Sequence, residues 1–98
     1  MFCHKVFETE NARLLAVCDA DLSGKTLSDD DFDVVVHPSF YGAEKVNAAV
    51  VLKAAKKSTI INALCNDIVN LLVKENLVEK SAVISIGKVK HAQVVTVF

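Results

Sequence analysis

Segments that favour β-strands stand at both ends of this sequence, and segments that favour helices lie between them. Residues 2–7 and 13–18 are rich in strand formers and flank the polar stretch ETENA, a pattern typical of a β-hairpin. Near the other end, AVISI and VKHAQVVTV flank Gly87-Lys88, a two-residue connection that suits a type II′ hairpin turn. The pattern favours a sheet built from both ends of the chain.

The middle of the chain predicts a strand and then helices. The stretch DADLSGKTLSDDD predicts a polar connection with one helical turn, which Asp19 can cap. After it, FDVVVH (residues 32–37) predicts a buried strand that ends at Pro38, because proline has no N–H to donate. Residues 43–57 then predict a helix with one apolar face. That face carries Val46, Val50 and Ala54.

A second helix is predicted from Ser58 or Thr59, either of which can cap it, to Asn76. Asn76 can adopt the left-handed conformation that ends a helix, and Leu77 can fold back on the last turn. The spacing of apolar residues indicates a stripe that packs on the sheet. The stripe consists of Ile61, Leu64, Cys65, Ile68 and Leu72.

The predicted order is β-β-β-α-α-β-β, which indicates an α+β fold with an antiparallel or mixed sheet and helices packed on one face. The chain has 98 residues, enough apolar material for one core, so residues 1–98 are expected to form a single domain. We see no signal peptide, and no uncharged run approaches the roughly 18 residues that a membrane span needs. We therefore expect a cytoplasmic protein without membrane contact.

The cysteines also favour the reducing cytoplasm, because an odd number of them without CxxC spacing is not typical of a disulfide framework. Cys3 and Cys18 are predicted to face each other across the first hairpin. With His4 nearby they could bind a metal, but two small apolar side chains in a half-buried sheet are the simpler interpretation. We therefore predict no metal site.

Charge is distributed unevenly along the chain. Residues 1–43 carry three basic and eight acidic side chains, and residues 44–98 carry eight basic and four acidic ones. The net charge is −1, so the sequence predicts a dipolar surface and not a uniformly basic one. The acidic run SDDDFD lacks the alternating ligands of a calcium loop. It is interpreted as a solvated loop, with a contact surface for a basic partner as the alternative.

No motif for catalysis or cofactor binding survives inspection, and we predict neither a catalytic residue nor a cofactor. LSGKT resembles the end of a phosphate-binding loop, but that motif needs a glycine where this chain has Asp19. No GxSxG elbow is present, and no cysteine lies in an obviously electropositive turn.

The last strand is chemically unusual because His91 and Gln93 interrupt an aliphatic run. Alternation places them on one face with Val95, while Lys88 and Lys90 occupy the other face with Ala92. Polar groups in such a strand need hydrogen-bond partners, so the pair is either structural or functional. We predict that His91 and Gln93 lie on the same side as Asn62 or Tyr41 and form a specific surface with them. Lys88 and Lys90 are predicted to flank that surface as an electrostatic guide.

Four stretches give the chain a resemblance to a family of short archaeal proteins known as domain of unknown function 424. They are CDADLSGKT, FYGAEKV, STIINALCNDIVNLLVKENLV and VISIGKVKHAQVV, and the resemblance extends over practically the whole chain. Cys65 and Asn76 stand where the family commonly carries glycine, and Lys90 where it carries proline. The most specific matches are Phe40-Tyr41-Gly42, Asn62, Gly87 and His91-Ala92-Gln93. The resemblance implies an archaeal cytoplasmic protein of this fold and no established activity.

Three functions agree with these observations. The first is a binding module associated with RNA or the translation apparatus, in which lysines contact phosphates and His91, Gln93 and Tyr41 contact bases. The second is a protein–protein adaptor or homodimer that uses a sheet edge or the terminal strand, residues 94–98. The third is an enzyme or small-ligand binder with His91 as acid or base and Asn62, Tyr41 and Gln93 as orienting groups. The lysines of the first function are Lys53, Lys56, Lys57, Lys80, Lys88 and Lys90.

Overall fold

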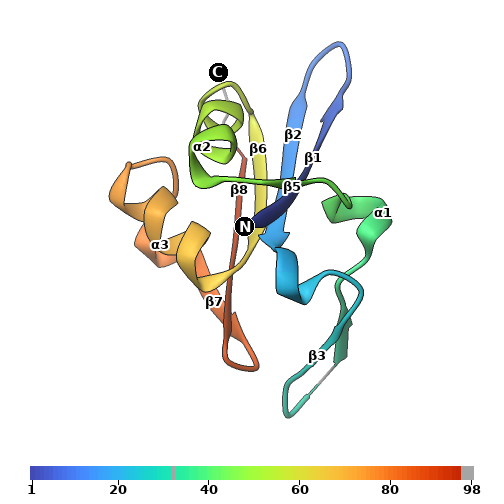
Figure 1. Cartoon of the computed structure of the whole chain (residues 1–98). Coiled ribbons are helices and arrows are strands. Elements are labelled where there is room, and N and C mark those ends of the chain that lie inside the picture. The colour runs from blue at the N-terminus through green and yellow to red at the C-terminus, as the bar shows by residue number, and fades with distance from the viewer. Residues whose placement is uncertain (32, 96–98) are drawn as a thin grey trace.

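A computed structural model describes residues 1–31 and 33–95 and shows one mixed sheet with helices on both sides (Figure 1). Six strands form the sheet in the order β5-β1-β2-β6-β8-β7. Strands β2 and β6 are parallel, and the other neighbours are antiparallel. The structure therefore confirms the α+β class. The strands are β1 (Phe2–Glu8), β2 (Arg13–Asp19), β5 (Lys45–Val46), β6 (Ile60–Leu64), β7 (Val83–Ile86) and β8 (Val89–Val95).

Both predicted hairpins are confirmed. β1 pairs with β2 along its whole length, and Gly87-Lys88 joins β7 to β8 after a short 3-10 helix, η2 (Lys80–Ala82). Gly87 has a φ of 60° while Lys88 has a negative φ, which fits the type II′ turn that the sequence predicted.

The two cysteines of the first hairpin face each other as predicted. Cys3 lies directly opposite Cys18, and both are buried as free thiols. His4 is the next residue along β1, so its side chain points to the other face of the sheet and does not join them. In the part of the chain that the structure describes, no group of three or more potential metal ligands occurs.

The connection after β2 contains the predicted helical turn. The side chain of Asp19 accepts a hydrogen bond from the N–H of Asp21 at 3.0 Å and caps the 3-10 helix η1 (Ala20–Leu22). The connection also contains a strand that the sequence did not predict, β3 (Thr26–Ser28). β3 belongs to a separate two-stranded ribbon outside the main sheet, so it can be largely polar. Because it lacks an apolar strand pattern, the sequence did not indicate it.

The strand expected at residues 32–37 is shorter than predicted, and it is not buried as predicted, because Asp33 and Val35 are exposed. β4 covers Asp33–Val35 and pairs with β3 in the ribbon, while residue 32 lies outside the described residues. The strand ends before Pro38, which begins the helix α1 (Pro38–Tyr41). Proline is well suited to this place, because an N–H at the first helical position would have no partner within the helix.

The helix predicted for residues 43–57 begins later than expected. α2 spans Ala48–Lys56, and Asn47 caps it by accepting a hydrogen bond from the N–H of Val50 at 3.1 Å. Val46 belongs instead to β5, at the edge of the sheet. Within α2, Val51 and Ala55 are buried, whereas Val50 is 42% exposed. The predicted stripe was wrong because it was counted from Val46, which is not helical.

The helix predicted from Ser58 or Thr59 to Asn76 is a strand followed by a helix. β6 occupies Ile60–Leu64, and α3 spans Asn66–Lys74. β6 is central to the sheet because its two neighbours, β2 and β8, take up the hydrogen-bonding groups along both of its edges. Asn62 is therefore a strand residue, which corrects its predicted place in a helix.

The apolar stripe of that prediction divides between two elements. Ile61 and Leu64 are both buried, but they contribute to different cores on opposite faces of the sheet. Only the second part of the stripe is helical. The buried face of α3 consists of Ile68, Val69 and Leu72.

The sheet separates two hydrophobic cores. α2 and α3 cover one face, as predicted for helices on one side, whereas α1 and the ribbon β3–β4 lie on the other (Figure 1). No helix among the described residues is long and apolar enough to cross a membrane. The core under α2 and α3 includes Leu15, Val17, Val51, Ile61, Ile68 and Leu72. The core under α1 and the ribbon includes Cys3, Cys18, Val36, Tyr41, Leu64 and Ile86.

The end of α3 confirms the predicted role of Asn76. Its φ is 59°, and it is the one residue other than glycine with a positive φ in the described chain. The N–H of Asn76 donates to the carbonyl of Val73 at 3.1 Å, and the N–H of Leu77 donates to that of Leu72 at 2.9 Å. These two bonds form a Schellman motif, which satisfies carbonyls that the helix itself leaves free.

Asn76→Gly is therefore expected to leave the free energy of unfolding unchanged or slightly higher, because glycine adopts a positive φ without strain. Asn76→Val is expected to lower it by about 1–2 kcal/mol, because a β-branched side chain is strained there. Urea denaturation of the two variants measures the difference. Equal stabilities would show that the helix does not depend on the left-handed residue.

Candidate functional site

The face of the sheet that points away from α2 and α3 is only half covered. At one end α1 and the ribbon bury Cys18, Leu64 and Ile86. At the other end Leu14 and Ile60 are half-buried neighbours that belong to neither core, and Val95 is 59% exposed. We call this uncovered area the open face. It consists of Leu14, Ile60, Asn62, Ile84, His91, Gln93 and Val95.

Strand register brings the polar members of the open face together. Asn62 of β6 lies directly opposite Gln93 of β8, and His91 lies opposite Ile84 of β7. The hydroxyl of Tyr41 donates to Oδ1 of Asn62 at 2.8 Å, and Nε2 of His91 lies 3.2 Å from the same oxygen. Tyr41, Asn62 and His91 therefore form one hydrogen-bonded group at the border between the covered and open halves.

This geometry fixes the proton on His91. An amide oxygen only accepts hydrogen bonds, so Nε2 must be the donor to Asn62. Burial lowers the pKa of His91 from its usual value, so the ring is neutral at pH 7 and Nδ1 is left as an acceptor. Nδ1 makes no hydrogen bond to the described residues and is not fully buried, so it can accept one.

Tyr41 supports the group but is itself nearly buried, with 7% of its surface exposed. Its ring packs edge-on against Phe40 at 4.9 Å between centroids. Burial, with a smaller effect from the nearby Cys18 thiol, raises the pKa of Tyr41 to about 12, so its hydroxyl remains a donor at neutral pH. Tyr41 thus orients Asn62. We expected its ring to contact a ligand, but the ring is not free to stack on one.

The structure brings four of the six predicted site residues together and separates the two lysines. Lys90 points to the face covered by α3, where its Nζ donates to Oδ1 of Asn70 at 2.7 Å. Lys88 lies exposed in the hairpin turn, and its carbonyl accepts from the side chain of Asn66 at 3.2 Å. The predicted alternation is confirmed for Lys90, which lies on the opposite face from His91. Its ammonium group therefore points away from the open face, and the predicted flanking role of Lys90 is wrong.

The arrangement suits recognition better than catalysis. The four hollows that we identify among the described residues measure about 210–450 Å³, and none is lined by Tyr41, Asn62 or His91. His91 contacts Asn62 and no carboxylate, so nothing found there raises its basicity. The acceptor on His91 and the exposed amide of Gln93 can instead make hydrogen bonds to a surface that covers them.

Sequence reasoning missed Leu14 and Ile60, two apolar residues of the open face. Ile60 was assigned to a helix, which removed it from the strand pattern. With β6 recognised as a strand, alternation would have placed Ile60 and Asn62 on one face, beside Leu14 of the parallel neighbour β2.

The fold and the site together define a small α+β domain with a half-covered sheet and a polar group at the edge of the cover. Comparison with known families gives the assignment, because a family model described as "Protein of unknown function (DUF424)" matches residues 7–97. The chain belongs to this family.

One solved structure shares the fold. It is described as "Crystal structure of an uncharacterized conserved protein from Methanopyrus kandleri" and is 21% identical in sequence, with a TM-score of 0.77. The match covers 99% of this chain and 94% of that one. No curated protein matches the sequence significantly.

Proposed function

We propose that the protein is a binding module and that it pairs with a second copy of itself through the open face. The observation that carries this proposal is the exposed aliphatic surface around groups with free hydrogen-bonding capacity. Val95 is 59% exposed and Ile84 is 56% exposed, on either side of His91 and Gln93. An apolar surface with a few hydrogen-bonding groups is the usual composition of a protein interface.

The shape of this side of the molecule favours a second copy of the chain as the partner that covers the open face. The ribbon and α1 stand over one half of the face, and the other half is free (Figure 1). Two copies facing each other in antiparallel orientation would place the ribbon of each over the open face of the other. Val35 on the outer side of the ribbon is 45% exposed and would supply an apolar contact. Such two-fold contacts are the commonest way in which identical chains associate.

Light scattering over a wide range of concentrations tests this pairing. The wild-type chain is expected to form dimers, and Val95→Asp is expected to be monomeric, because it buries a charge in the interface. His91→Ala and Gln93→Ala should weaken the dimer, and Gln93→Ala should do so without a lower melting temperature, because Gln93 is exposed.

Val50→Asp is the matched control, because Val50 is an exposed valine on α2, on the other side of the sheet. It should still form dimers. A wild-type chain that stays monomeric at high concentration, or equal association of the Val50 and Val95 variants, would refute self-pairing. Unchanged pairing together with a lowered melting temperature of the His91 variant would assign His91 a structural role.

RNA or the translation apparatus is a second candidate partner. Lys53, Lys56 and Lys57 lie on the last two turns of α2 and at its end, so they form a local group of positive charge on this helix. Such a cluster would contact phosphates and produce binding that weakens as salt increases. Indifference to both RNA and ribosomes would remove this candidate. We place either function in the cytoplasm, because the three cysteines are free thiols.

A further inference from the structure

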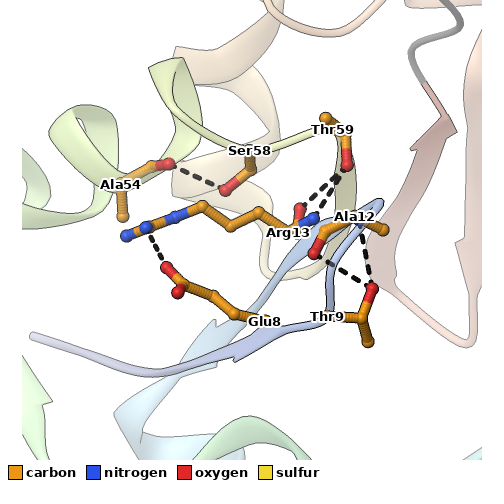
Figure 2. A network of polar contacts seen from close by, with 7 residues as sticks. All are labelled: Glu8, Thr9, Ala12, Arg13, Ala54, Ser58 and Thr59. Carbon is orange, nitrogen blue, oxygen red and sulfur yellow. Dashed lines mark hydrogen bonds and ion pairs between the residues drawn. The ribbon is translucent and has the colours of Figure 1, made fainter.

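A hollow of about 210 Å³ lies between the start of β2 and the last turns of α2. Its lining contains three cationic side chains and two small apolar ones. Lys53 and Lys57 are four residues apart and therefore share a face of the helix, and Arg13 approaches from the strand. Figure 2 shows the side chain of Arg13 extending towards the end of α2, beside Ala54 and Ser58. The lining residues are Arg13, Val50, Lys53, Ala54 and Lys57.

The positive charge of this hollow is only partly neutralised. Arg13 pairs with Glu8 through Nη1, and this is the single ion pair found in the described part of the chain. Two lysines at this helical spacing repel each other. The carbonyl of Ala54, which could attract them, already accepts from the N–H of Lys57 and from the hydroxyl of Ser58. Glu8 is therefore the one carboxylate found to pair with these three cations in the described residues, and it leaves a net positive charge at the site.

The backbone of Arg13 is held in place by Thr59, and its guanidinium has donors to spare. Its N–H donates to Oγ1 of Thr59 at 2.9 Å, and its carbonyl accepts from the N–H of Thr59 at 2.9 Å (Figure 2). Because Glu8 occupies only Nη1, the amino group Nη2 has no hydrogen bond within the described residues. The Nε atom is buried without a partner. A guanidinium with an unused donor is a common element of sites that bind oxyanions.

We propose that Arg13, Lys53 and Lys57 bind a phosphate group in this hollow. A phosphate carries up to two negative charges and accepts hydrogen bonds from several directions, which matches donors that arrive from a strand and from two turns of a helix. The site deepens the RNA candidate by giving it a place for one backbone phosphate, although a free phosphate would offer the same chemistry. It lies on the other side of the sheet from the open face and does not depend on pairing.

Titration followed by NMR tests the proposal with two probes, inorganic phosphate and a single-stranded RNA oligonucleotide, each compared with sodium chloride at equal ionic strength. Saturable shifts are expected at the amides of Arg13 and residues 53–58. The variant Lys53→Ala/Lys57→Ala should bind the probe at least about tenfold more weakly, since it loses two charged donors.

The control is Lys45→Ala/Lys74→Ala, which removes the same charge from exposed positions that neither line the hollow nor belong to the lysine cluster of α2. It should bind like the wild-type chain. Binding of inorganic phosphate supports the site whether or not RNA binds, and binding of RNA alone at these amides assigns it to backbone phosphates. Shifts that chloride reproduces, or that survive in Lys53→Ala/Lys57→Ala, would overturn the proposal, whereas dimer formation would be unaffected.

Discussion

Gly42→Ala is expected to lower the free energy of unfolding by about 3 kcal/mol or more. Gly42 follows α1 with φ 87° and ψ 169°, a conformation that essentially only glycine adopts. A methyl group there would also overlap the backbone carbonyl oxygen of His4 in β1. The backbone of β1 is held by its pairing with β2 and cannot move aside cheaply, so strain and overlap add. Urea denaturation measures the loss, which is a large part of the stability of a small domain.

Gly24→Ala separates the two contributions. Gly24 also has a positive φ, 82°, but a side chain there would meet no atom within 4 Å. Its variant should therefore show only the conformational cost, about 1–2 kcal/mol. If Gly42→Ala were no more damaging than Gly24→Ala, the close approach of α1 to β1 would be incorrect.

Ile68→Ala is expected to cost about 2–5 kcal/mol, the range for truncating a buried aliphatic side chain. Ile68 is fully buried on the face of α3 that packs against the sheet, together with Val69 and Leu72. The cavity would open between α3 and three strands that are themselves hydrogen-bonded, so the surroundings can relax only partly. Chemical denaturation of the variant beside the wild-type chain gives the value.

Two further variants provide a comparison for this loss of stability. Ile68→Val should cost only about 0.5–1.5 kcal/mol, because it removes a single methylene group. Lys74→Ala, at an exposed position of the same helix, should stay within about 0.5 kcal/mol of the wild-type chain. A loss below half a kilocalorie for Ile68→Ala would mean that α3 packs through a different face.

The hairpins at the two ends of the chain could be predicted because their information is local. Strand formers on both sides of ETENA, and a glycine in a two-residue connection, determine a pairing between neighbours in sequence. The cap of η1 by Asp19 and the left-handed Asn76 were predictable for the same reason, since each depends on contacts within a few residues.

β6 could not be predicted in this way, because its partners are distant. Ile60–Leu64 pairs with residues 14–18 on one side and with residues 91–95 on the other. Within its own window the spacing of Ile61, Leu64 and Cys65 fits a helix as well as a strand. Tertiary pairing overrides local spacing here, as it commonly does for short apolar segments.

The sequence predicted which residues of the candidate site lie close together better than it predicted the secondary structure around Asn62. Alternation along the last strand placed His91 and Gln93 on one face, and that placement holds because β8 is regular. Asn62 was expected near them while assigned to a helix, and it reaches them from the neighbouring strand. The polar group itself depends on Tyr41, whose position follows from α1 folding over the sheet, which no spacing in the sequence indicates.

The central position of β6 affects the order in which the chain can fold. The hairpin of β1 and β2 can form early, because its strands are adjacent in sequence. β6 can join β2 only after a loop of roughly forty residues closes, and until β8 arrives its other edge resembles the edge strands that associate between chains. During synthesis the sheet would therefore stay incomplete until the final hairpin has left the ribosome. Folding should be limited by this late docking step, and intermediates that lack β8 should be the species most prone to aggregate.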